Sequence, residues 1–363
     1  MIAVRPAADV LPSAAGPYGT LVAVGLSHRT ATVALRERAA LTEPSARALL
    51  GDLRSTAAVS AAAVLSTCNR TELYAIAAAP GAVETLREAL AARGRLDTEA
   101  VAAAGYACSG RDALTHLFRV TAGLDSLVVG EPEIQHQVRR AADVAGDEGT
   151  LRGPLREAFR HALAAGRRVR RETAIARGAV STASVGVELT RRALGDLHGR
   201  PALVVGAGAM ASSMARALAR HGVEGPVVCN RTPAAGRRLA AEVGGRAAPL
   251  GALPGELERA DLVVACTGAP EPVLRRRVAA RALARRGGRP LVCLDLAMPR
   301  DVEPAVASLD GVILFDVDDL RVAADANRSG RALEARRAEA IVAAEVARCL
   351  ERARGAARLE RAA

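Results

Sequence analysis

The chain has 363 residues, which is too long for one ordinary domain and predicts two or three. Half of the residues are hydrophobic, 2% are aromatic, and the formal charge is +11, carried entirely by Arg because the sequence contains no Lys. The sequence has no apolar run of membrane-spanning length and no C-x-x-C pair among its six cysteines, which excludes a membrane-spanning helix, a disulfide framework and a zinc site. We expect a soluble, cytoplasmic protein. The basic charge suits a polyanionic partner, but a biased composition explains it equally well.

The N-terminal region predicts a compact α/β domain built around a cysteine. Residues 1–19 are rich in Ala and Pro and read as a flexible extension. Strands are expected at 21–26, 61–65 and 73–77, and short helices at 33–40, 44–53 and 81–93.

The polar turn between the second and third strands, residues 66–72, presents Cys68 beside Arg70. A thiol attacks as its thiolate, and a nearby cation lowers its pKa. The alternative is an inert, buried cysteine, although the polar neighbours Thr67, Asn69 and Glu72 favour a reactive one.

Apolar residues recur at helical spacing along 111–122, and His116 lies beside that stripe. The pattern breaks at 123–126 and a new helix starts near Glu131 and Glu133, whose charges are also ordinary at a helix N-terminus. Residues 151–177 carry many Arg side chains, which fit a phosphate backbone or a solvated helix face.

From about residue 181 the pattern changes to strands alternating with helices, which predicts a parallel, doubly wound sheet. The strand 201–205 runs into the loop 206–211, G-A-G-A-M-A, and then a helix, as a dinucleotide-binding turn requires. The next strand ends in Asn230-Arg231-Thr232 with no acidic residue, and Arg231 favours the 2′-phosphate of NADP(H). From Asp318 the sequence predicts a long, exposed helix with little to pack against in this chain, which suggests a partner or a second subunit.

These features together resemble the glutamyl-tRNA reductase family. The motifs that carry the resemblance are GLSHRTATVALRE (25–37), STCNRTE (66–72), GLDSLVVGEPEI (123–134), the loop 206–211, NRT (230–232) and DLAMPRD (295–301). The resemblance implies an α/β fold with a catalytic substrate-binding domain (20–178), a Rossmann-like NADPH domain (179–317) and a fragment of the spinal dimerisation helix (318–363), with most of the dimerisation domain absent.

The implied reaction is the NADPH-dependent reduction of glutamyl-tRNA(Glu) to glutamate-1-semialdehyde, the first step of five-carbon tetrapyrrole (porphyrin) biosynthesis. Cys68 would form a thioester with the glutamyl group, and His116 would assist proton transfer. The implied substrate-binding residues are Thr67, Cys68, Asn69, Arg70 (as a carboxylate clamp), Ser126, Glu131, Pro132, Glu133 and Gln137. The implied cofactor-binding residues are Gly206, Ala207, Gly208, Ala209, Met210, Ala211, Asn230, Arg231 and Thr232.

The sequence departs from the family pattern at Thr32, where the family has Pro, and at Glu133, where it has Gln. Implied partners are a second copy of the chain and glutamate-1-semialdehyde aminomutase. Two alternatives remain: a shikimate-dehydrogenase-like NADP reductase, which needs no nucleophilic cysteine, and a non-catalytic regulator that binds tRNA or a pathway enzyme.

Overall fold

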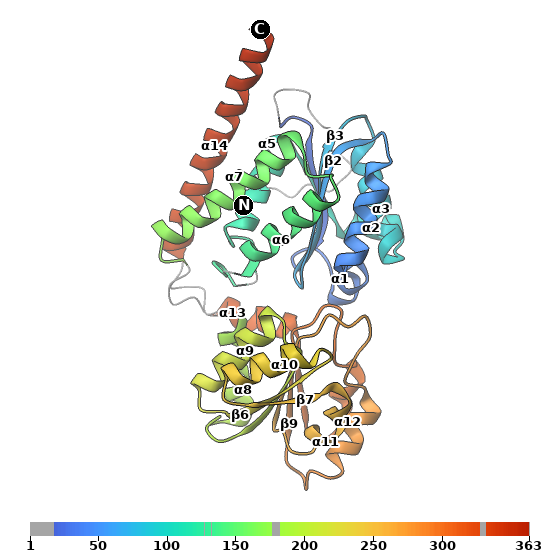
Figure 1. Ribbon diagram of the computed structural model, residues 1–363, viewed down its shortest axis with the longest axis vertical. Coiled ribbons are helices and arrows are strands. Elements are labelled where there is room, and N and C mark those ends of the chain that lie inside the picture. Colours follow the sequence, from blue (N-terminus) through green and yellow to red (C-terminus); the bar gives the residue numbers. More distant parts are fainter. Residues whose placement is uncertain (1–17, 127, 132, 176–181, 327–331, 363) are drawn as a thin grey trace. The chain divides into compact units, whose positions relative to one another are not determined.

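The computed structural model describes residues 18–126, 128–131, 133–175, 182–326 and 332–362. The chain divides into two compact units, the first formed by Met1–Ala179 with Arg328–Ala363 and the second by Val180–Asn327 (Figure 1). The predicted α/β class is confirmed in both units.

The first unit is built on a four-stranded antiparallel sheet in the order β2-β3-β1-β4. Helices α2 and α3 pack on one face, and α5, α6 and α7 on the other (Figure 1). The elements are β1 (Leu21–Ser27), α1 (Val33–Ala39), α2 (Glu43–Arg54), β2 (Val59–Ser66), β3 (Arg70–Ala77), α3 (Ala82–Gly94), α4 (Thr98–Ala104), β4 (Tyr106–Ser109), α5 (Gly110–Thr121), α6 (Glu133–Asp147), α7 (Gly153–Glu172) and α14 (Ala332–Ala362).

Helix starts in this unit follow from local side-chain chemistry. Thr32 precedes α1, and its hydroxyl accepts the N–H of Leu35 at 3.4 Å, so this departure from the family pattern supplies an N-cap. Thr42 caps α2 in the same way, and Pro44 lies in its first turn.

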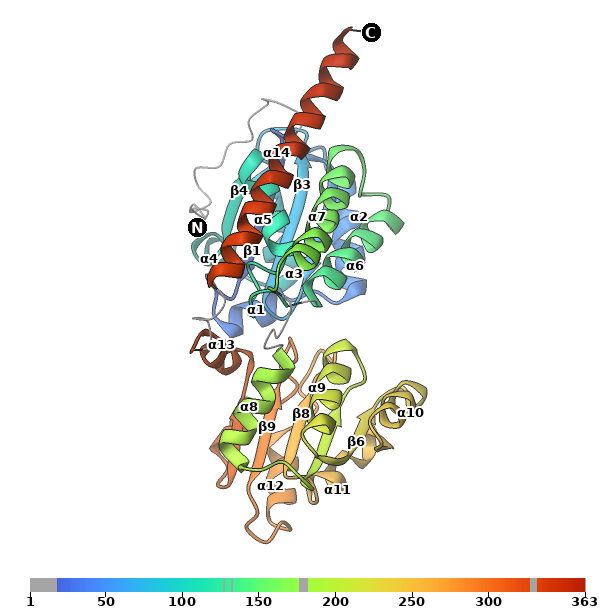
Figure 2. The same ribbon diagram turned by 90° about the vertical axis from the view of Figure 1, so that its left-hand side faces the viewer.

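The C-terminal region forms two helices, α13 and α14, with residues 327–331 outside the described range. The expectation that this region has little to pack against in the chain is wrong. One stripe of α14 is buried against α5 and α7, as Figure 2 shows, through Ala338, Val342, Val346 and Cys349. Tyr18, expected in the flexible extension, is buried too, 3.3 Å from the sulfur of Cys349. The rest of that extension, 1–17, lies outside the described residues.

The second unit contains a six-stranded parallel sheet in the order β10-β9-β8-β5-β6-β7, which confirms the Rossmann-like prediction. Helices α8 and α9 lie on one side of this sheet, and α11 and α12 on the other (Figure 1). The elements are α8 (Thr182–Leu194), β5 (Pro201–Val205), α9 (Ala209–Arg220), β6 (Glu224–Asn230), α10 (Pro233–Glu242), β7 (Arg246–Pro249), α11 (Leu253–Leu257), β8 (Leu262–Ala265), α12 (Arg276–Leu283), β9 (Leu291–Asp295), β10 (Val312–Phe315) and α13 (Val317–Ala326).

Candidate active site

The predicted turn between β2 and β3 is present, and Cys68 lies at its tip. The hydroxyl of Thr67 accepts the N–H groups of Asn69 and Arg70, each at 3.2 Å, and the Thr67 N–H donates to the Arg70 carbonyl at 2.8 Å. A guanidinium nitrogen of Arg36 donates to the Cys68 carbonyl at 2.9 Å. The turn is therefore fixed from both sides, and the partly exposed Cys68 has a defined position.

The electrostatic surroundings of Cys68 differ from the expectation. Burial and the nearby Glu131 carboxylate raise the pKa of the thiol to about 12, and the opposing effects of Arg36 and Arg70 are smaller. Arg70 lowers the thiol pKa as expected of a nearby cation, but burial outweighs it, so the resting site holds a thiol. The reactive role of Cys68 stays a prediction.

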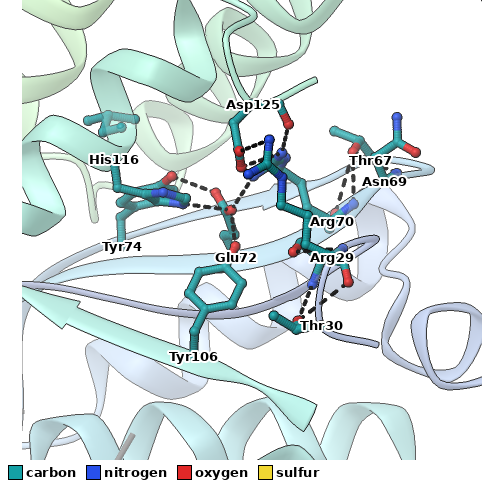
Figure 3. A network of polar contacts seen from close by, with 12 residues as sticks. Arg29, Thr30, Thr67, Asn69, Arg70, Glu72, Tyr74, Tyr106, His116 and Asp125 are labelled. Carbon is teal, nitrogen blue, oxygen red and sulfur yellow. Dashed lines mark hydrogen bonds and ion pairs between the residues drawn. The ribbon is translucent and has the colours of Figure 1, made fainter. Parts of the chain in front are cut away.

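A fully buried carboxylate, Glu72, lies at the centre of the polar network behind the turn (Figure 3). Its Oε1 lies 2.7 Å from Arg70 Nη1 and 2.9 Å from His116 Nε2, and the hydroxyls of Tyr74 and Tyr106 also donate to it. Burial would raise the pKa of Glu72, but the charge of Arg70 and the four donors hold it well below its usual range. Gly25, opposite Glu72 on β1, makes room for it, because a Cβ there would lie 2.8 Å from the Glu72 Cγ.

Arg70 is buried and already paired. Its Nη1 and Nη2 atoms lie 3.1 and 3.0 Å from Asp125 Oδ2, in addition to the contact with Glu72 (Figure 3). Arg29 approaches the other Asp125 oxygen at 3.0 Å, and its side chain is 40% exposed. The substrate-clamp role of Arg70 stays a prediction, and it would require exchange of these existing ion pairs.

Of the remaining predicted substrate residues, Ser126 and Glu131 lie in the segment between α5 and α6, whereas Glu133 and Gln137 belong to α6. Ser126 is buried, whereas Glu131, Glu133 and Gln137 are partly exposed. Pro132 lies outside the described residues. Two left-handed glycines shape the segment: the N–H of Gly130, at φ +88°, donates to the carbonyl of Gly123, at φ +74°, at 2.9 Å.

The predicted cofactor segment, 206–211, follows the C-terminal end of β5 and includes the first residues of α9. Gly206 has φ +113°, and a Cβ on it would lie 2.4 Å from the carbonyl oxygen of Cys266, so only glycine fits. A Cβ on Gly208 would meet nothing within 4 Å, so the backbone at the N-terminus of α9 faces open space. β5 lies between β6 and β8, where the strand order reverses, and this is the place at which dinucleotides bind in such sheets. These residues fit a pyrophosphate.

The predicted nucleotide-specificity residues follow β6. Asn230 donates its side-chain amide to the Thr232 carbonyl at 2.9 Å, which fixes the turn. Arg231 and Thr232 are exposed.

Sequence reasoning missed most of the network around Glu72. Glu72 and Asp125 lay inside the quoted motifs without an assigned role, and Tyr74, Tyr106 and Arg29 were not singled out. The glycine opposite Glu72 in a predicted strand was the available signal, because a strand glycine often marks a close approach.

Two buried acids were also missed: Asp295, the last residue of β9, and Asp301, which follows it. Asp295 accepts the N–H groups of Ala297, Asp301 and Val302 at 3.1, 3.3 and 2.8 Å, and burial raises its pKa to about 7. Asp301 accepts the N–H of Thr267 at 2.5 Å and thereby holds the loop after β8, whose Cys266 packs against Gly206.

Comparisons with known proteins agree with both units. The family described as "Glutamyl-tRNAGlu reductase, N-terminal domain" matches residues 24–173, and the family "Shikimate / quinate 5-dehydrogenase" matches residues 188–323. Among the described residues, no helix is long and apolar enough to cross a membrane.

Relatives named glutamyl-tRNA reductase match over most of the chain. The protein from Desulforudis audaxviator is 42% identical over 90% of this chain and 73% of its own length, and that from Rubrobacter xylanophilus is 43% identical over 89% and 75%. The solved glutamyl-tRNA reductase from Methanopyrus kandleri is 37% identical, with a TM-score of 0.50 over 92% of this chain and 80% of that one. The chain therefore belongs to the glutamyl-tRNA reductase family.

Proposed function

We propose that this chain reduces glutamyl-tRNA(Glu) to glutamate-1-semialdehyde with NADPH, through a thioester on Cys68, as the first step of tetrapyrrole biosynthesis. The observation that carries the proposal is a cysteine fixed at the tip of a turn, in a chain that also contains a dinucleotide-binding fold. We place the reaction in the cytoplasm, where cysteines remain reduced.

The first chemical step is acyl transfer. The Cys68 sulfur loses its proton and attacks the ester carbonyl; a C–S bond forms, the C–O bond to the tRNA ribose breaks, and the ribose oxygen takes a proton. Because the resting group is a thiol, this step needs a base when the substrate is bound.

His116 is our candidate for moving that proton. The ionised Glu72 accepts a hydrogen bond from Nε2 of His116, which assigns the proton to Nε2 and leaves Nδ1 as the basic atom. Tyr74 stacks on the imidazole with ring centroids 6.4 Å apart, and Tyr106 meets it edge-on at 5.4 Å. These contacts orient the ring.

The second step is reduction of the thioester. A bound nicotinamide cofactor supplies the hydride. As the C–S bond breaks, Cys68 leaves as the thiolate and the aldehyde is released. The turn at Gly206 and the N-terminus of α9 would bind the pyrophosphate, and the exposed Arg231 supports a preference for the 2′-phosphate of NADPH over NADH.

The proposal also includes two protein partners. The family resemblance supports a homodimer and transfer of the aldehyde to glutamate-1-semialdehyde aminomutase. Because Ala338, Val342 and Val346 of α14 pack within the chain, a dimer would use other residues.

The test is a turnover assay with glutamyl-tRNA carrying labelled glutamate. We expect labelled semialdehyde with NADPH, and a slower reaction with NADH. Binding of both ligands without any product would support the regulator instead, and activity on a small hydroxy acid alone would support the shikimate-dehydrogenase-like reductase.

A further inference from the structure

Two buried polar atoms beside Cys68 have no hydrogen-bond partner among the described residues: Nδ1 of His28 and Oδ1 of Asn69. The two residues are neighbours, because the His28 N–H donates to the Asn69 carbonyl at 2.8 Å. His28 follows directly after β1, whose last residue, Ser27, pairs with Arg70. The backbone of His28 is therefore held against the cysteine turn, and the residue is only 8% exposed.

These two atoms contrast with the charged groups of the network around Glu72, which are paired. Arg70, Glu72 and Asp125 bind one another through several short contacts. Buried polar atoms normally find partners, and an exception indicates that a missing molecule supplies one. The charged groups of the network pair with each other, whereas Nδ1 of His28 and Oδ1 of Asn69 have no hydrogen-bond partner among the described residues.

The imidazole of His28 is uncharged at neutral pH. Its pKa is lowered to about 4, mainly by burial. The positive charges of Arg70, Arg29 and Arg36 lower the pKa further and outweigh the opposing effect of the Asp125 carboxylate. A neutral imidazole with its proton on Nε2 presents Nδ1 as an acceptor. The Asn69 Oδ1 atom is an acceptor as well.

We propose that Nδ1 of His28 and Oδ1 of Asn69 accept hydrogen bonds from the α-ammonium group of the glutamyl ester, which makes His28 a specificity-determining residue. This inference rests on the proposed function. The ammonium group sits on the carbon next to the carbonyl that Cys68 attacks, so it must lie near the cysteine turn. An ammonium group has three N–H donors, enough for both acceptors. The side-chain carboxylate of the substrate needs donors instead and lies farther from the reacting carbonyl.

The experiment compares three esters of the same tRNA: glutamyl, glutaryl (which lacks the ammonium group) and glutaminyl (which lacks the carboxylate). The readout is the rate at which label becomes bound to the whole 363-residue chain without cofactor. Wild type should react with the glutamyl ester about 10- to 100-fold faster than with the glutaryl ester, which corresponds to loss of hydrogen bonds to a charged group.

His28→Leu should remove that preference and keep the preference for glutamyl over glutaminyl. His28→Gln, which keeps an uncharged acceptor, should retain part of the preference for glutamyl over glutaryl. His161→Leu, on α7 outside the site, is the matched control and should behave as wild type. Because all three tyrosines lie in the first unit, tyrosine fluorescence checks that each variant folds.

Three results would overturn the inference. The first is equal rates of wild type with the glutamyl and glutaryl esters, and the second is an equal slowing of both esters by His28→Leu, which indicates a structural role. The third is a His28→Leu protein that keeps the preference for glutamyl over glutaryl but loses the preference for glutamyl over glutaminyl. If His28→Leu does not fold, the wild-type comparison and His28→Gln decide. If wild type binds no label from any ester, the proposed function fails and this inference falls with it.

Discussion

Nε2 of His116 lies 2.9 Å from Oε1 of Glu72, although the two residues are 44 positions apart in the chain. The contact joins α5 to β3, and Arg70 and two tyrosine hydroxyls meet the same carboxylate. His116, the residue expected to move protons, and Arg70, in the turn that holds Cys68, therefore contact the same buried carboxylate.

Glu72→Gln should destabilise the first unit by about 3 kcal/mol or more, because it leaves the buried guanidinium of Arg70 with one carboxylate partner instead of two. Denaturant unfolding followed by tyrosine fluorescence measures this. Glu84→Gln removes an exposed partner of Arg87 and should cost less than about 1 kcal/mol. Equal losses for the two variants would show that Glu72 has no special structural role.

Acid should also destabilise the network. The folded-state pKa of Glu72 is depressed, so its stabilisation is present above the pKa of the unfolded carboxyl and is lost as the pH falls toward the lower folded value. Wild type should therefore lose stability of the first unit on acidification more steeply than Glu72→Gln. Parallel pH profiles for the two proteins would contradict the depressed pKa.

Alkylation of Cys68 should be slow at neutral pH, and its rate should keep rising with pH up to the raised pKa of about 12, because the thiol stays mostly protonated below that value. Glu131→Gln should speed alkylation at fixed pH, since removing a nearby negative charge lowers the thiol pKa. Glu133→Gln is the matched control. Peptide mass mapping assigns the label to Cys68, and an unchanged rate in Glu131→Gln would show that its charge does not reach the sulfur.

Alanine substitutions at the two glycines of the cofactor loop should have different effects. Gly206→Ala should destabilise the second unit, because the new Cβ meets the Cys266 carbonyl and φ is positive. Gly208→Ala should fold normally but bind the dinucleotide more weakly, because its Cβ enters the space assigned to the pyrophosphate. Calorimetric titration with NADPH and thermal unfolding distinguish the two effects; normal NADPH affinity in Gly208→Ala would place the cofactor elsewhere.

The sequence predicted the central strands and the nucleotide loop well, because these carry strong local signals: continuous apolar runs and glycines at fixed spacing. It missed β4 and β7, which are four-residue edge strands, and β7 contains only Arg, Ala and Pro. The packing of α14 was missed because its buried stripe begins with Ala338 and ends with Cys349, small side chains that give a weak periodic signal.

The site residues likewise fall into those with a local sequence signal and those without one. Cys68 and the loop at Gly206 were found from local motifs, whereas the partners of Glu72 come from β3, β4 and α5 and meet only in the folded sheet. The thiol pKa depends on burial and on Glu131, neither of which is local to the cysteine.

The most direct measurement of the central claim is a single-turnover reaction of labelled glutamyl-tRNA with wild type, Cys68→Ser and the control Cys108→Ser, which changes another partly exposed cysteine of the same unit. Without cofactor, wild type and Cys108→Ser should retain label on the protein; with NADPH they should release labelled semialdehyde. Cys68→Ser should lose both signals by at least about 10³-fold. Equal labelling and turnover in Cys68→Ser and wild type would show that Cys68 is not the nucleophile and would contradict the thioester mechanism.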